Sequence, residues 1–227
     1  MLRTAFLAWS MWTCGNLLAE AETAAPKLIF HADFDRPQNL VRHARGLDLA
    51  ACRMLQLEPG RTGQALAVRS AANDMWADSA GNLDLARGTL SLWYRRFPEA
   101  KDAATCSLFA CNEGLKQGLP GLHVAVSRGE SLQASLHLPE GGLSASLKGI
   151  ADEAWIHVAV TWDCQVGYGL YLNGKLARSK TAQWRPSFAS GMLIGANYQE
   201  HRGNFARGLI DEVRLYDQPL TAQQVQL

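Results

Sequence analysis

The sequence predicts an all-β protein, a two-sheet antiparallel β-sandwich. Segments with strand character, about a dozen in all, follow one another at a spacing of roughly 8–15 residues. No segment between them has the character of a helix that could cross over between parallel strands. The dipeptide Asn173-Gly174 joins two alternating runs, which is a strong short-range signal for a hairpin.

Residues 1–21 have the three parts of a secretory signal peptide. Arg3 supplies the positive charge, residues 5–12 form a short apolar run, and residues 19–21 (Ala-Glu-Ala) fit the rule for a cleavage site. We therefore expect cleavage after Ala21 and a secreted or periplasmic protein.

The rest of the chain, residues 26–227, is expected to form one domain. The alternative for the N-terminus is a lipoprotein signal with Cys14 acylated, although the three residues before it match a lipobox poorly. No later run is long and apolar enough for a membrane helix.

The formal net charge of +1 argues against a nucleic-acid partner, because no basic stripe would neutralise phosphates.

The first third of the mature chain has weak strand signals. Residues 28–34 alternate with a period of two and predict a first strand. Residues 36–64 are interrupted by proline and glycine and are predicted to be irregular. Residues 65–69 predict a short strand, and residues 70–87 predict a polar loop.

From residue 88 the alternation becomes regular. Strands are predicted at residues 88–96, 105–110, 121–127, 131–138, 143–147, 155–162, 168–172, 175–178, 192–196 and 208–216. Thr221 and Gln224 match a capping box, which predicts the start of a short helix.

The last strand carries acidic residues among apolar ones. Leu209, Val213 and Leu215 are expected on one face, with Asp211 beside them. A carboxylate that faces a core is costly unless a cation, an arginine or backbone N–H groups pair with it. Glu212 is expected to face the other way, into solvent.

Four cysteines remain after the signal peptide. Cys52, Cys106, Cys111 and Cys164 suggest up to two disulfides in an oxidising compartment, with three possible connectivities. If Cys106 and Cys111 lie in one continuous strand, about 16 Å separates them. That distance is too long for a bridge between these two.

Five segments resemble, in order, the pattern of laminin-G-like, concanavalin A-like lectin/glucanase domains. They are residues 28–35, 59–66, 88–93, 155–163 with 170–175, and 208–216. The resemblance implies a two-sheet jelly roll, in a family whose domains usually bind sugars, adhere to surfaces or accompany secreted enzymes. It also implies a structural Ca²⁺ held by Asp33 and Asp211, although calcium prefers six to eight oxygen ligands. The alternative is that Asp211 pairs with Arg214 or caps a loop.

Tryptophans in loops are the predicted sugar-binding residues, because pyranose rings stack on flat aromatic faces. Trp76 and Trp184 lie in predicted loops, and residues 197–204 place aromatic and polar side chains in another loop. The predicted ligand-binding residues are Trp76, Trp184, Tyr198, His201 and Arg202. The resemblance places three other tryptophans at core or near-core positions, with structural roles: Trp93, Trp155 and Trp162.

Catalytic motifs are absent from the sequence. There is no Gly-x-Ser-x-Gly or His-Glu-x-x-His motif. The Glu-x-Asp-x-x-Glu strand of related glucanases, which would supply two carboxylates on one face, is also missing. His157 alone is expected to be structural. We therefore predict an exported, non-catalytic carbohydrate-binding or adhesion domain. The alternatives are a protein-interaction module of the cell surface or periplasm, and a divergent glycosidase or polysaccharide lyase.

Overall fold

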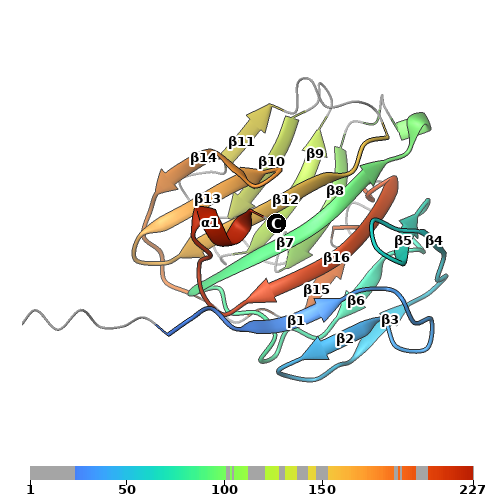
Figure 1. The fold of residues 1–227 in the computed structure, drawn as a ribbon, viewed down its shortest axis with the longest axis horizontal. Helices are drawn as coiled ribbons and strands as arrows, with labels where there is room; N and C mark the ends of the chain where they lie inside the picture. Colours follow the sequence, from blue (N-terminus) through green and yellow to red (C-terminus); the bar gives the residue numbers. More distant parts are fainter. Residues whose placement is uncertain are drawn as a thin grey trace, which may run out of the picture.

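Two antiparallel sheets stack face to face in the computed structural model (Figure 1). The structure describes residues 24–100, 103, 105–111, 121–127, 131–136, 143–146, 153–186, 189, 191–197 and 204–226. The predicted two-sheet β-sandwich is confirmed.

The first sheet has nine strands. Its main order is β14 (Lys175–Thr181), β13 (Gly167–Leu172), β12 (Ile156–Asp163), β7 (Arg87–Arg96), β16 (Gly208–Tyr216), β1 (Leu28–Ala32) and β2 (Val41–Ala44). β5 (Gln64–Val68) pairs with the start of β16, and β4 (Leu57–Pro59) pairs with β5. The first and last strands of the chain, β1 and β16, are therefore neighbours inside the sheet.

The second sheet has seven strands. Their order is β11 (Leu143–Ser146), β10 (Ser131–Leu136), β9 (Leu122–Ser127), β8 (Thr105–Cys111), β15 (Met192–Ile194), β6 (Met75–Ala77) and β3 (Ala50–Cys52). A 3₁₀ turn at Pro98–Ala100 follows β7, and the helix α1 (Ala222–Val225) ends the described chain. The segments predicted to be loops, 36–64 and 70–87, in fact contain β2, β3, β4 and β6. Strands of three or four residues are too short to give a periodic signal.

The main core lies between the sheets and is built by alternation along the strands. In β7, Leu90, Leu92 and Tyr94 face the core, whereas Ser91 and Trp93 between them belong to the opposite face. Trp162 in β12 is 1 % exposed and is one of the largest fully buried side chains. On the outer face of the nine-stranded sheet, α1 packs over β12 and β13 (Figure 1).

A β-bulge in β16 changes which side chains face the core. The register of β16 against β7 shifts between Asp211 and Arg214, and Glu212 has a positive φ of 54°. An extra residue in a strand reverses the alternation beyond it. As a result Val213 points into the main core, whereas Leu209 packs in a separate outer cluster. The expectation that Leu209 and Val213 share a face is therefore wrong.

The hairpin at Asn173-Gly174 is confirmed. Leu172 pairs with Lys175, and the two turn residues have φ values of 48° and 76°. Positive φ at both positions is the geometry of a type I′ turn, which matches the twist of the strands. The capping box at Thr221 is also confirmed, because its hydroxyl accepts from the Gln224 N–H while the Gln224 side chain accepts from the Thr221 N–H.

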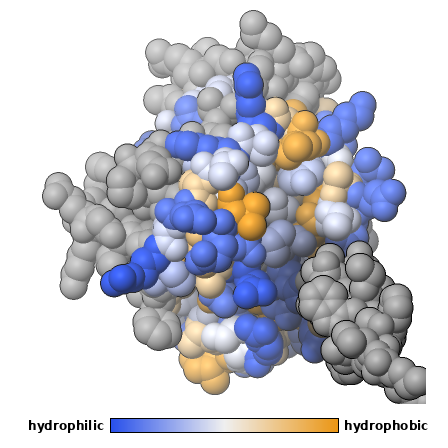
Figure 2. Space-filling view, turned by 90° about the vertical axis from the view of Figure 1, so that its left-hand side faces the viewer, coloured by the Kyte–Doolittle hydropathy of each residue, from blue (hydrophilic) through white to orange (hydrophobic). Residues whose placement is uncertain are grey.

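The edge strand β14 is exposed along nearly its whole length and carries Lys175, Arg178 and Lys180. The face of the molecule that contains this edge shows mainly hydrophilic side chains with separate hydrophobic spots (Figure 2). Charged side chains on an edge strand discourage pairing with another chain.

None of the four described cysteines is in a disulfide. β8 is continuous from Thr105 to Cys111, so Cys106 and Cys111 lie too far along one strand to bridge. Cys52 in β3 is separated from β8 by β6 and β15, about 14 Å at normal strand spacing. Cys164 lies in the turn after β12, in the other sheet. The disulfides expected from the even number of cysteines are thus not present.

Candidate binding site

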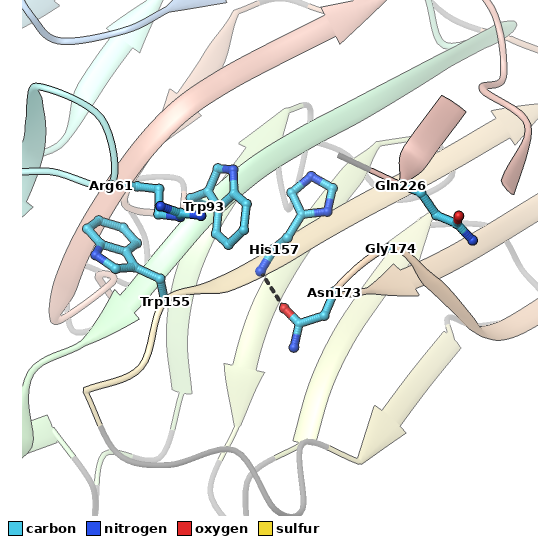
Figure 3. A pocket seen from close by; sticks show the side chains of 7 residues that line it. All are labelled: Arg61, Trp93, Trp155, His157, Asn173, Gly174 and Gln226. Carbon is cyan, nitrogen blue, oxygen red and sulfur yellow. Dashed lines mark hydrogen bonds between the residues drawn. The ribbon is translucent and has the colours of Figure 1, made fainter. Parts of the chain in front are cut away.

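A pocket of about 640 Å³ opens on the outer face of the nine-stranded sheet. Its volume lies within the range of typical ligand sites. Strands β7 and β12, the β13–β14 turn, the β4–β5 loop and the end of α1 contribute to it. We call it the outer pocket, and it is lined by Arg61, Trp93, Trp155, His157, Asn173, Gly174 and Gln226 (Figure 3).

Trp93 is the centre of the outer pocket. It pairs across the strands with His157 on one side and with Asp211 on the other. Its half-buried indole ring lies 5.1 Å from the His157 ring between centroids, and the Arg61 guanidinium carbon lies 4.8 Å from the indole centroid. The Arg61 side chain reaches toward Trp93, with Trp155 next to it (Figure 3).

Arg61 is positioned by a buried carboxylate. Asp211 Oδ2 accepts the backbone N–H groups of Arg61 and Thr62, at 2.8 and 3.0 Å. A Cβ on Gly60 would lie 2.7 Å from the same oxygen, so the loop needs glycine there. This loop cap is one of the alternatives considered for Asp211, and it places the Arg61 side chain over the indole.

Asp211 itself is 0 % exposed, and its second oxygen, Oδ1, has no hydrogen-bond partner among the described residues. Burial raises the pKa of the Asp211 carboxyl to about 6, although the two loop N–H groups act in the opposite direction. The cost of burying this carboxylate is thus offset only in part.

His157 is held as a neutral imidazole. It is 2 % exposed, and burial, with a smaller effect from Arg214, lowers its pKa to about 4. Its ring lies 2.8 Å from the Ser91 hydroxyl, and its backbone N–H donates to Asn173 Oδ1 at 2.9 Å. The second bond fixes the hairpin turn at the edge of the outer pocket.

Trp155, just before β12, forms the second aromatic wall of the outer pocket. It is half-buried and packs against the outer cluster that contains Leu209 and Phe97. The Arg95 guanidinium carbon lies 5.1 Å from its ring centroid. Both tryptophan rings therefore carry an arginine over one face.

Glu212 is not solvated as predicted. It is 7 % exposed, lies 2.7 Å from His31 Nε2, and is ion-paired with Arg214. The bulge at this residue directs its side chain to these partners. Burial lowers the pKa of His31, although Glu212 opposes this effect.

The two predicted metal ligands have separate partners. Asp33 is ion-paired with Arg42 at 3.2 Å and also accepts the Asp35 N–H, whereas Asp211 caps the Arg61 loop. The described residues contain no group of three or more His, Cys, Asp or Glu side chains that could hold a metal ion.

The predicted sugar-binding tryptophans lie elsewhere. Trp184 packs against the main core: its indole N–H donates to the Leu85 carbonyl at 3.0 Å and its ring meets Tyr168 edge-on. Trp76 belongs to β6 rather than to a loop and is half-buried in the seven-stranded sheet. Tyr198, His201 and Arg202 lie outside the described residues.

The outer pocket instead contains two of the three tryptophans that were expected at core or near-core positions, Trp93 and Trp155. The third, Trp162, lies in the main core. The signal that could have separated them is strand parity. Trp93 is out of phase with Leu92, and Trp155 is out of phase with Ile156, which faces the core.

A family model described as the concanavalin A-like lectin/glucanases superfamily matches residues 70–226. The chain belongs to this family. A search of curated proteins found no match. The described part of the chain has no helix that could cross a membrane.

Solved structures with the same fold have low sequence identity to this lectin-like domain. Domain 4 of AbnA, a GH43 extracellular arabinanase from Geobacillus stearothermophilus, in complex with arabinotriose, is 19 % identical with a TM-score of 0.61, covering 88 % of this chain and 97 % of that one. The binding domain of Paraclostridial Mosquitocidal Protein 1 is 16 % identical with a TM-score of 0.65, covering 88 % and 51 %. The botulinum neurotoxin serotype D ligand binding domain in complex with N-acetylneuraminic acid is 11 % identical with a TM-score of 0.66, covering 88 % and 49 %. The chain spans about half of the two toxin domains.

Proposed function

We propose that this protein is an exported, non-catalytic carbohydrate-binding domain that binds a glycan in the outer pocket. The observation that carries the proposal is a pocket with two indole walls and several hydrogen-bonding side chains on a rigid sheet. Aromatic walls with a few polar groups are the usual composition of a small-ligand site. Two structures with this fold contain a saccharide, which supports a glycan at the level of the fold.

The composition of the outer pocket favours binding over hydrolysis. No aspartate or glutamate is among its described lining residues, whereas most glycosidases need a pair of carboxyl groups across the bond they cleave. His157 and Ser91 form a close pair, but the histidine is buried. A similar pair, Ser107 with His123 at 3.0 Å, occurs on the seven-stranded sheet, which favours a structural role for both.

A glycan array tests this function and also identifies the face that binds. We expect residues 22–227 to bind a subset of saccharides and Trp93→Ala to weaken binding at least tenfold, with circular dichroism confirming the fold. Loss of one aromatic contact removes about 0.5–1.5 kcal/mol in addition to the contribution of the apolar area that the ring buries. Trp76→Ala is the competing variant, because Trp76 is a predicted sugar-binding residue on the other sheet. A flat array would refute glycan binding. Loss of binding only in Trp76→Ala would move the site to that sheet.

We also propose one structural calcium ion near Asp211. Its support is Asp211 Oδ1, a buried oxygen without a partner among the described residues, whereas the other Asp211 oxygen and both Asp33 oxygens have donors. The described side chains therefore do not form a complete calcium shell, and any ion would need carbonyls or water in addition.

Thermal melts with calcium and with chelator test the ion. Calcium at about 100 times its Kd should stabilise the fold by about 2.7 kcal/mol, and Asp211→Asn should abolish the shift. Identical melts of the wild type in both buffers would rule the ion out.

Export is tested separately, by N-terminal sequencing of the protein recovered from the periplasm or the medium. The mature protein should begin at Glu22.

A further inference from the structure

We infer that the outer pocket selects anionic saccharides, and that the recognised group is the carboxylate of a uronic acid residue. This inference rests on the proposed glycan-binding function of the same pocket and names its ligand class. The juxtaposition that carries it is a pair of stacked arginines, Arg61 on Trp93 and Arg95 on Trp155.

Both guanidinium groups are held by aromatic rings rather than by acids. The guanidinium carbons lie 4.8 and 5.1 Å from the indole centroids, within the range of cation–π contacts. A guanidinium attracted to an aromatic face is ordered without pairing its N–H groups with a carboxylate. Those N–H groups form a fork that matches a carboxylate.

Neither arginine has a carboxylate within 4 Å in the described part of the chain. Other arginines do have such a partner: Arg42, Arg45, Arg53, Arg69 and Arg214. Some exposed arginines, such as Arg185, also lack one. Arg61 and Arg95 differ from these because each is also ordered by contact with a tryptophan that lines the outer pocket. An incoming anion therefore has no internal carboxylate to displace there.

The remaining groups around the outer pocket are compatible with a negative ligand. Asn173 already accepts the His157 N–H through Oδ1, so its amide NH₂ is the group it offers to the pocket. Lys175 follows the turn and is exposed.

Among nearby acids, Asp211 is buried beneath the Arg61 loop, Glu212 is ion-paired, and Glu153 is exposed just before Trp155. Of these three described acids, Glu153 is the one that is solvated and opposes the two arginines.

Calorimetry with paired ligands isolates the carboxylate. The ligands are oligogalacturonate and its methyl ester, which differ in charge but retain the same sugar hydroxyls. We expect the wild type to bind the free acid about 10- to 100-fold more tightly, as for hydrogen bonds to charged groups. Added salt should reduce this preference.

Charge-removing variants assign the effect to residues. Arg61→Gln and Arg95→Gln should each lower the acid-to-ester ratio about tenfold, and Arg61→Lys should retain only part of it because lysine lacks the planar fork. Arg185→Gln removes the same charge at an exposed site away from the outer pocket and should leave the ratio unchanged. Thermal melts establish that each variant is folded.

Each alternative outcome has a distinct meaning. Equal binding of acid and ester would overturn the anionic preference while leaving glycan binding intact. Preference for dextran sulfate over both galacturonate forms would overturn the carboxylate assignment. If no saccharide bound, neutral dextran included, the proposed function would fail together with this inference.

Discussion

Replacing Trp162 by alanine is expected to lower the free energy of unfolding by about 3–5 kcal/mol. The side chain is 1 % exposed between the two sheets, and its indole N–H donates to the Asp84 carbonyl at 2.9 Å. Its ring lies so close to Gly88 that a Cβ there would be 2.6 Å from the ring carbon Cζ2. Truncation would leave a cavity and remove this hydrogen bond.

Trp155→Ala is the matched comparison, because it removes the same side chain from the outer face. We expect its cost to be below about 2 kcal/mol, since the half-buried ring loses only part of the apolar contact of a core residue. Urea unfolding at pH 7 measures both variants against the wild type, with unchanged m-values showing that the comparison is valid. Equal losses would mean that Trp155 belongs to the core.

The second large effect is a pair of opposite pH dependences on the two sides of Trp93. The pKa of His157 is about 4 in the folded protein, below its usual 6.5. The unfolded chain therefore takes up the proton first as the pH falls. The contribution of His157 to stability is present above pH 6.5 and is lost between pH 6.5 and 4, by up to about 3 kcal/mol.

Asp211 acts with the opposite sign. Its pKa is about 6 in the folded protein, above its usual 3.8. The folded state keeps the proton where the unfolded chain has lost it. Its contribution is therefore greatest below pH 4 and is lost as the pH rises through 6, also by up to about 3 kcal/mol.

Urea unfolding between pH 4 and 7, with chelator present, separates the two groups. In the wild type the two contributions largely cancel between pH 4 and 6. His157→Gln should make stability fall with rising pH relative to the wild type, and Asp211→Asn should make it rise. His31, whose pKa burial also lowers, is common to all three proteins and does not affect their differences. Parallel pH profiles for all three proteins would contradict the assignment of both shifts.

Residues that act locally were predictable from the sequence. Asn173-Gly174 predicted its hairpin because the turn depends on the φ preferences of two adjacent residues. Thr221 predicted the start of α1 because a capping box is closed within four residues. The alternation in β12 placed Trp162 in the core for the same reason, since period two is a property of a single strand.

The sequence alone thus determined the all-β class, the long strands and the closing helix, because each depends on neighbours along the chain. Only the tertiary structure decided the site. The bulge at Glu212 reversed the faces of β16, buried this glutamate beside His31, and left Asp211 to hold a loop 150 residues away in sequence. That loop carries Arg61 to Trp93. A constellation assembled from β7, β12, β16 and the β4–β5 loop depends on strand order and register, which no local pattern specifies.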